Sequence, residues 1–285
     1  MRNEISLNET RSARRTYKNQ SLERALQILS AFTVDRTAMT LSEISKSANL
    51  APPTAMRLCR TLLQYDFLSF DQQTKKYSPG LKLFELGGIV YSNFSLRKIV
   101  SPYLAKLQLK FGKTTFLGIL HNDELLYIDK LENPNNYIRF ASNVGTRRPP
   151  FFGMLGQLLM AYLPETEVDR ILQKKPLVAF TKRSITDVAT FKERLKKIRE
   201  EGFFIDQEEA IDGITGISAP IRDLNGNVIA AIGVGFISSS VSEDEKKIIV
   251  KELVAVAEEI SRKLCACGGK GKMGTREQYE MYEKG

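Results

Sequence analysis

The 285-residue sequence has no tryptophan, one histidine and three cysteines. Cys59, Cys265 and Cys267 are too few for a disulfide framework, and the last two stand too close together for a zinc knuckle. His121 alone cannot build a histidine-rich metal site, and we expect it on the surface at a hairpin turn. The sequence therefore predicts no metal and no cofactor.

Long apolar runs are also missing. No segment approaches the roughly 18 apolar residues that a membrane-spanning helix requires. Residues 1–18 lack the apolar centre of a secretory signal. We expect a protein of the cytoplasm that has no membrane partner.

Positive charge is concentrated near the N-terminus. The formal net charge of the chain is +9; residues 1–80 carry 12 basic and 7 acidic side chains and so contribute +5 of it. More than half of the excess lies in less than a third of the chain, which favours a polyanionic partner for this part.

The densest local signals lie between residues 40 and 70. Thr40 and Glu43 have the spacing of a capping box, which predicts the start of a helix. Asn49 can end that helix in a left-handed conformation, and Pro52 and Pro53 favour the start of the next. Two short strands around residues 71–74 then predict a wing. This order is typical of a winged helix-turn-helix, whose second helix enters the major groove of DNA.

The second helix supplies the candidate DNA contacts. The planar fork of arginine matches O6 and N7 of guanine, and hydroxyls near a helix start can meet a phosphate. The candidates are Ser42, Pro53, Thr54, Ala55, Met56, Arg57, Arg60, Lys75 and Lys76. We expect Leu58, Thr61, Leu62 and Tyr65 to face inward and Cys59 to be a packing residue. The alternative for Arg57 and Arg60 is an ordinary solvated helix face, including a pair with Glu43 or Asp66.

The remaining sequence predicts an α+β domain, with helices before and after an antiparallel sheet. Asn225-Gly226 is the strongest hairpin signal in the chain, between strands 214–222 and 228–237. Ser21 is expected to cap the first helix. The predicted divisions are a disordered basic tail at 1–19, a winged helix-turn-helix at 20–79, a linker and dimerisation helix at 80–95, an effector-binding domain at 96–267 and a disordered tail at 268–285.

One set of segments follows a characteristic order along the chain: 21–26, 50–62, 76–81, 186–187, 201–203, 206–209 and 219–220. This ordered set resembles the IclR family of bacterial transcription regulators. The resemblance implies a winged helix-turn-helix, a linker helix used in dimerisation and a GAF-like effector-binding domain. It also implies a homodimer or dimer of dimers on a palindromic operator of double-stranded DNA, with a small-molecule effector.

The same resemblance implies effector contacts from three segments. The residues concerned are Phe152, Met154, Leu155, Asp206, Ile214, Gly216, Gly233 and Gly235. The family frequently has cysteine where Gly216 stands and small hydroxyl residues where Gly233 and Gly235 stand. These glycines predict a larger, less polar cavity and an organic or aromatic acid as effector. Alternatively, they allow close packing of strand against helix.

Two other functions compete with an effector-controlled regulator. One is a DNA-binding protein that uses its C-terminal domain only to oligomerise. The other is a hydrolase that uses Asp206, Glu208 and Glu209 for acid–base work. The sequence contains no nucleophile elbow, glycine-rich phosphate loop or metal-ligand cluster, and so favours a regulator over an enzyme.

Overall fold

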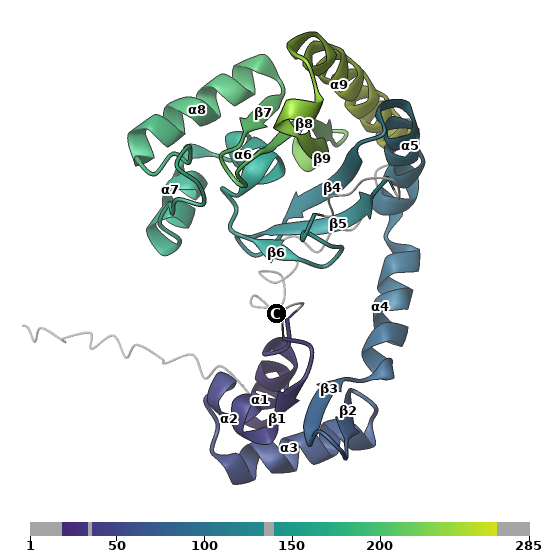
Figure 1. Cartoon of the computed structure of the whole chain (residues 1–285), viewed down its shortest axis with the longest axis vertical. Helices are drawn as coiled ribbons and strands as arrows, with labels where there is room; N and C mark the ends of the chain where they lie inside the picture. Colours follow the sequence, from purple (N-terminus) through teal and green to yellow (C-terminus); the bar gives the residue numbers. More distant parts are fainter. Residues whose placement is uncertain (1–18, 34–35, 134–139, 267–285) are drawn as a thin grey trace, which may run out of the picture. The chain divides into compact units, whose positions relative to one another are not determined.

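A computed structural model describes residues 19–33, 36–133 and 140–266 (Figure 1). The chain divides into two compact units, residues 1–90 and 91–285. The tails predicted to be disordered, apart from Asn19, lie outside the described residues, as does Cys267. No helix in the described ranges combines the length and the apolar character that a bilayer crossing requires.

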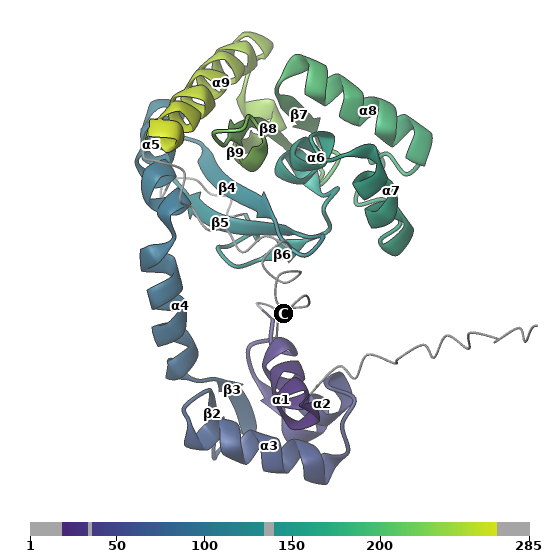
Figure 2. The ribbon, with the colours of Figure 1, turned by 180° about the vertical axis from the view of Figure 1, so that it is seen from behind.

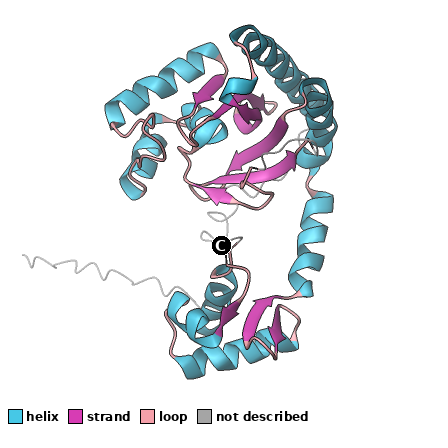
Figure 3. Ribbon diagram, viewed as in Figure 1, coloured by secondary structure: helices cyan, strands magenta, loops and turns pink. Residues whose placement is uncertain are grey.

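In the first unit, the described residues before α4 form three helices and a small antiparallel sheet of order β1-β3-β2 (Figure 3). Its elements are α1 (Gln20–Ser30), β1 (Met39–Thr40), α2 (Leu41–Ser47), α3 (Pro52–Gln64), β2 (Leu68–Asp71) and β3 (Lys76–Pro79). Ile28, Ile44, Leu58 and Leu68 join these elements in one buried core. The core fixes α3 against α2 and the wing, and a winged helix-turn-helix results.

Local sequence signals set most helix boundaries of this unit. The capping box of α2 is confirmed, because Thr40 accepts from the backbone of Glu43 and the Glu43 carboxylate accepts from the Thr40 N–H at 2.7 Å. Asn49 has the left-handed φ of 50° expected after α2. Asn19, two residues before Ser21, caps α1, so the prediction for Ser21 is wrong. The Asn19 side chain accepts from the N–H groups of Ser21 and Leu22, so the helix begins two residues earlier than predicted.

The helix α4 (Leu81–Asn93) follows the wing. Gly80 precedes it because a Cβ there would lie 2.1 Å from the carbonyl oxygen of Asp66. Large apolar side chains of α4 are exposed, among them Leu81, Phe84 and Val90. Exposed apolar patches of this kind are typical of interaction surfaces.

The second unit is built on an antiparallel sheet of order β6-β5-β4-β9-β8-β7 (Figures 1 and 2). Its elements are α5 (Ser95–Phe111), β4 (Thr114–Leu120), β5 (Leu125–Leu131), β6 (Arg147–Arg148), α6 (Gly153–Ala161), α7 (Glu165–Lys174), α8 (Val188–Glu201), β7 (Phe204–Gln207), β8 (Ile214–Arg222), β9 (Val228–Ile237), the 3₁₀ turn Ser238–Ser240 and α9 (Glu243–Ala266). The hairpin at Asn225-Gly226 is confirmed, with Arg222 paired to Val228.

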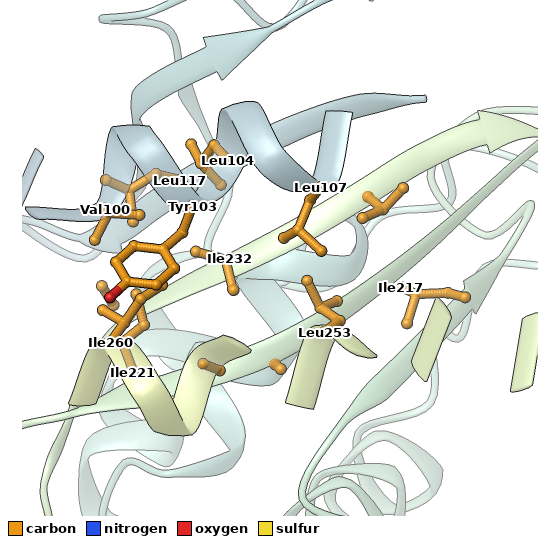
Figure 4. Close-up of a cluster of buried hydrophobic side chains, with 14 of the residues drawn as sticks. Val100, Tyr103, Leu104, Leu107, Leu117, Ile217, Ile221, Ile232, Leu253 and Ile260 are labelled. Carbon is orange, nitrogen blue, oxygen red and sulfur yellow. The ribbon is translucent and has the colours of Figure 1, made fainter. Parts of the chain in front are cut away.

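The two faces of this sheet are covered by different helices. Leu107 of α5 and Leu253 of α9 pack against Ile217 and Ile232 on one face (Figure 4). On the other face, Leu155 and Leu158 of α6 pack with Phe116, and the core continues into α7 and α8. Side chains alternate between faces along a strand, so β8 and β9 place large apolar residues toward α5 and α9. Their small residues face α6.

Candidate DNA-binding face and effector site

The helix α3 has a buried face and an opposite exposed face. Ala55, Leu58, Cys59 and Leu62 recur at helical spacing and are buried in the core of the first unit. Met56, Arg57 and Arg60 recur at the same spacing on the other side of the helix and are exposed. Helical periodicity therefore presents both guanidinium groups on the side of α3 away from the core.

The acids nearby do not neutralise the two arginines. Glu43 is engaged by Thr40, whose backbone hydrogen bond lowers the pKa of this carboxyl. In the part of the chain that the structure describes, neither Arg57 nor Arg60 forms an ion pair with Glu43 or Asp66. The two predicted ion pairs are therefore not formed, while the exposure of both arginines fits a solvated helix face and a DNA contact alike.

Two residues of α3 lie differently from their predicted positions. Ala55 is fully buried, three and four residues before Leu58 and Cys59, so its side chain cannot contact DNA, contrary to the prediction. Tyr65 is 63% exposed, because α3 ends at Gln64 and the backbone of Tyr65 is no longer helical. Thr61 is also exposed rather than turned inward.

The other candidate DNA contacts are accessible. Ser42 at the front of α2 and Pro53 in the first turn of α3 are exposed, and Thr54 is half-buried. Lys75 and Lys76 are exposed on the wing, and the backbone of Lys76 lies opposite Asp71 in the register of β2 and β3. The carboxylate of Asp71 accepts from the backbone of residues 73 and 74, and these bonds hold the wing turn and lower the pKa of Asp71.

Cys59 is a packing residue in this fold. Its thiol is fully buried in the core of the first unit, and burial raises its pKa to about 11. A thiol reacts as its thiolate, which this site disfavours. A redox switch at Cys59 is therefore not supported.

Four strands of the second unit place one row of residues side by side beneath α6. Thr114, Gly235, Gly216 and Asp206 are successive partners across β4, β9, β8 and β7. The row has a hydroxyl at one end, a carboxyl at the other and two glycines between them. The Oγ1 of Thr114 is buried and, within the described ranges, has no hydrogen-bond partner.

A second row of the same four strands continues the floor. Phe116, Gly233, Ser218 and Phe204 are successive partners. The Ser218 hydroxyl donates to the carbonyl oxygen of Met154 at 2.8 Å and so ties the first turn of α6 to β8. We call the two rows together the trough: small residues lie in the middle of both rows, and Phe116 and Phe204 end the second one.

Asp206 is buried at one end of the trough. Its Oδ1 accepts from the N–H of Glu209 at 2.8 Å, and its Oδ2 lies near Gly153 at the start of α6. Burial raises the pKa of Asp206 to about 7, although backbone hydrogen bonds from Glu209 and Ala210 oppose the shift. The carboxyl can therefore be neutral or charged near neutral pH.

Met154 lies over the centre of the trough. A Cβ on Gly216 would lie 2.5 Å from the Sδ of Met154, and a Cβ on Gly233 would lie 2.8 Å from its Cε. Gly235 is covered in the same way by Phe116 and Phe140, which meet edge to face at 5.4 Å. The prediction of a larger cavity above the three glycines is therefore wrong for this structure, in which they allow close packing.

The remaining predicted effector residues occupy three different places. Leu155 is buried and packs over Gly118, beyond the trough. Ile214 is half-buried at the end of β8. Phe152 precedes α6 and meets Phe180 edge to face at 4.9 Å. The structure thus brings Met154, Asp206 and the three glycines together and leaves Leu155 and Ile214 at the margins.

Sequence reasoning missed several polar residues around the trough. The Arg148 guanidinium stacks on Phe152 at 5.3 Å, and its buried Nε has no hydrogen-bond partner in the described ranges. The Tyr127 side chain forms a hydrogen bond with Ser142, and burial raises the pKa of the Tyr127 hydroxyl. Thr114 was also missed. The place of each of these residues beside the trough depends on strand register or loop position, so no local sequence pattern predicts it.

A second polar cluster lies beside α6. Arg194 and Gln157 bind the two carboxylate oxygens of Glu209 at 2.6 and 3.1 Å. Next to them is a cavity of about 10 Å³, lined in part by Gln157 and Ser184, which has room for one water molecule. Glu208 lies 3.5 Å from Arg183 instead. Asp206 and Glu209 are therefore linked through the Glu209 N–H, whereas Glu208 has a partner of its own. In the described residues no group of three potential metal ligands occurs.

These two units define a class of protein: a helix-turn-helix regulator with a C-terminal sensor-type domain. The chain belongs to the IclR family. The family domain described as bacterial transcriptional regulator IclR C-terminal matches residues 89–262, and the IclR helix-turn-helix domain matches residues 21–72.

Known regulators resemble the chain over most of its length. The HTH-type transcriptional regulator XynR of Escherichia coli (strain K12) is 31% identical over 245 residues, which cover 86% of this chain and 97% of XynR. The HTH-type transcriptional repressor AllR of the same strain is 30% identical over 225 residues, with coverages of 79% and 83%. These relatives are named as regulators, as the sequence predicted.

Solved structures of the family share the fold. The IclR transcriptional regulator from Alicyclobacillus acidocaldarius aligns with a TM-score of 0.78 and 27% identity, covering 86% of this chain and 99% of that one. An IclR homologue from Microbacterium hydrocarbonoxydans, complexed with 4-hydroxybenzoate, aligns with a TM-score of 0.75 and 26% identity, with coverages of 86% and 98%.

Proposed function

We propose that this protein is a transcriptional regulator that binds an operator through α3 and responds to a small organic acid at the trough beneath α6. The observation that carries the DNA-binding part is the exposed, unneutralised pair Arg57 and Arg60 on the outer face of α3. Arginine side chains on a recognition helix can read guanine and hold phosphates together. Met56, directly before Arg57 and about one turn before Arg60, offers an apolar contact for a thymine methyl group.

The effector part rests on the chemistry of the trough. The first turn of α6 has no side-chain cap, so its N–H groups are suited to a carboxylate. Arg148 adds a positive charge close to Phe152 and Tyr127. The unpaired hydroxyl of Thr114 and the aromatic side chains suit a ligand with one polar and one apolar end. The homologue complexed with 4-hydroxybenzoate supports an aromatic acid as the first ligand to try.

A dimer or dimer of dimers on a palindromic operator completes the proposal. The exposed apolar side chains Leu81, Phe84 and Val90 make α4 the surface that a second copy would cover. Two recognition helices would then meet successive major grooves. Analytical ultracentrifugation tests this part, and a strictly monomeric chain at micromolar concentration would contradict it.

The central experiment selects DNA with the full chain from a random duplex library. We expect a palindromic consensus that the wild-type chain enriches and the Arg57→Ala/Arg60→Ala double variant does not. Lys196→Ala/Lys197→Ala removes the same charge from exposed positions of α8 and should leave the selection unchanged. Adding 4-hydroxybenzoate to the selected duplex then tests effector control. DNA binding that no small acid alters would favour the effector-independent alternative.

A further inference from the structure

We propose that Met154 determines the specificity of the effector site. Its thioether fills the slot above Gly216 and Gly233, and an effector binds there by displacing it. The inference rests on the proposed effector function. The ligand class it defines is an acid that carries a flat or unbranched apolar group, because such a group replaces the methionine side chain.

The contact between Met154 and the two glycines is complementary in shape. The Sδ approaches Gly216 on β8 and the Cε approaches Gly233 on β9, both closer than a Cβ would permit. The slot is therefore as wide as one unbranched chain, and backbone forms its floor. A flat ring or straight chain fits such a space, whereas a branched carbon does not.

Met154 is suited to leave the slot while its backbone stays in place. Methionine is unbranched, has three rotatable side-chain bonds and repacks easily. The residue is half-buried, so a path toward solvent exists. Ser218 holds the carbonyl oxygen of Met154, which limits the movement to the side chain. The neighbouring Phe116 and Phe140 meet edge to face, and each has only two rotatable side-chain bonds.

The space that Met154 vacates leads to polar groups that a bound acid can use. Asp206 and Thr114 end the row that contains Gly216, and the first turn of α6 contributes N–H groups. A ligand in the slot would thus keep its apolar part over the glycines. Its polar atoms would lie toward the ends of the row or the start of α6.

The test follows the methyl resonances of methionine in the full chain labelled with ¹³C at Cε. Met154→Leu and Met160→Leu assign the two α6 signals, and buried Met160 serves as the internal reference. We expect 4-hydroxybenzoate and hexanoate to shift the Met154 signal and leave the Met160 signal in place. Pivalate, which has a branched carbon, should shift neither.

Affinities provide the second measurement. Met154→Ala should bind 4-hydroxybenzoate about tenfold more tightly, because no side chain must be displaced first. Gly216→Ala should weaken binding, since its Cβ enters the slot. Binding that leaves the Met154 methyl unmoved and is unaffected by Met154→Ala would overturn this inference alone. An absence of binding by every acid, in every variant, would overturn the effector function with it.

A measurement without ligand checks the packing itself. Gly216→Ala should lower the thermal midpoint of the wild-type chain by several degrees. In the Met154→Ala background the same change should lower it little, because the added Cβ then enters vacated space. An equal drop of the thermal midpoint in both backgrounds would contradict the packing of Met154 against Gly216.

Discussion

The sulfur of Met154 lies 2.5 Å from the point where Gly216 would carry a Cβ. A long side chain on α6 and a missing one on β8 thus form a single contact. The small residues of β8 and β9 on this face provide space for Met154, while the opposite face carries the large residues that pack on α5 and α9. The sheet therefore carries one core beneath α5 and α9 and a second beneath α6, and in the second Met154 fills the space above Gly216 and Gly233.

Arg57→Ala should weaken binding to the selected operator by about 1–3 kcal/mol if the side chain reads a base. Arg57 is exposed on the outer face of α3 and forms no ion pair in the described residues, so its loss should not destabilise the fold. Fluorescence anisotropy with the selected duplex measures the effect, with scrambled duplex as control. Unchanged affinity in a folded variant would remove Arg57 from the interface.

Lys76→Ala should weaken binding to all DNA duplexes alike, whatever their base sequence. If this exposed wing lysine meets a phosphate, as we propose, its removal should reduce the slope of log affinity against log salt by about 1. Titrations of selected and scrambled duplexes at several salt concentrations give this slope. A loss confined to the selected duplex would instead indicate base reading by the wing.

Asp206→Asn should stabilise the protein increasingly as pH rises. The pKa of Asp206 is raised from 3.8 to about 7 by burial, so the fold favours its protonated form. In the wild-type chain, protonated Asp206 makes its full contribution to the free energy of unfolding below pH 3.8. This contribution is lost as the pH rises toward 7. Asparagine does not ionise, so the variant should gain roughly 2–4 kcal/mol over the wild type across this window.

Urea unfolding at a series of pH values measures this gain. Asp212→Asn, at an exposed position of the same segment, is the matched control. A constant difference between wild type and Asp206→Asn from pH 4 to 8 would show that Asp206 titrates normally.

The thiol of Cys59 should resist reagents until the first unit unfolds. It is fully buried and its pKa is raised to about 11, so little thiolate exists at pH 8. In the Cys265→Ser/Cys267→Ser variant, a disulfide reagent such as DTNB should release its chromophore only after urea is added. Rapid stoichiometric release from the folded variant would restore a redox role for Cys59.

Arg170→Ala should destabilise the second unit by roughly 1 kcal/mol. Arg170 on α7 binds both carboxylate oxygens of Asp123, at 2.7 and 2.6 Å, and so joins α7 to the turn between β4 and β5. The partners are about a quarter exposed, which limits the gain through solvent screening. Lys247→Ala, which breaks a far more exposed pair with Asp244, should change the free energy of unfolding much less.

Local sequence determined the elements of this protein and much of its DNA-binding face. The capping box at Thr40, the hairpin at Asn225-Gly226 and the inward residues of α8 were predictable, because each depends on neighbours within one or two turns. Ala55 could have been placed correctly from its spacing to Leu58 and Cys59. The amphipathic helix α7 also has a local pattern and was missed.

Only the tertiary structure decided the composition of the candidate effector site. Thr114 and Gly235 are adjacent because β4 and β9 pair, although more than a hundred residues separate them in the chain. No local pattern reports that register, nor does it report that Met154 fills the space above two glycines. Helix caps and turns follow from short-range hydrogen bonds and sterics, whereas the content of a cavity follows from which strands pair and which helix covers them.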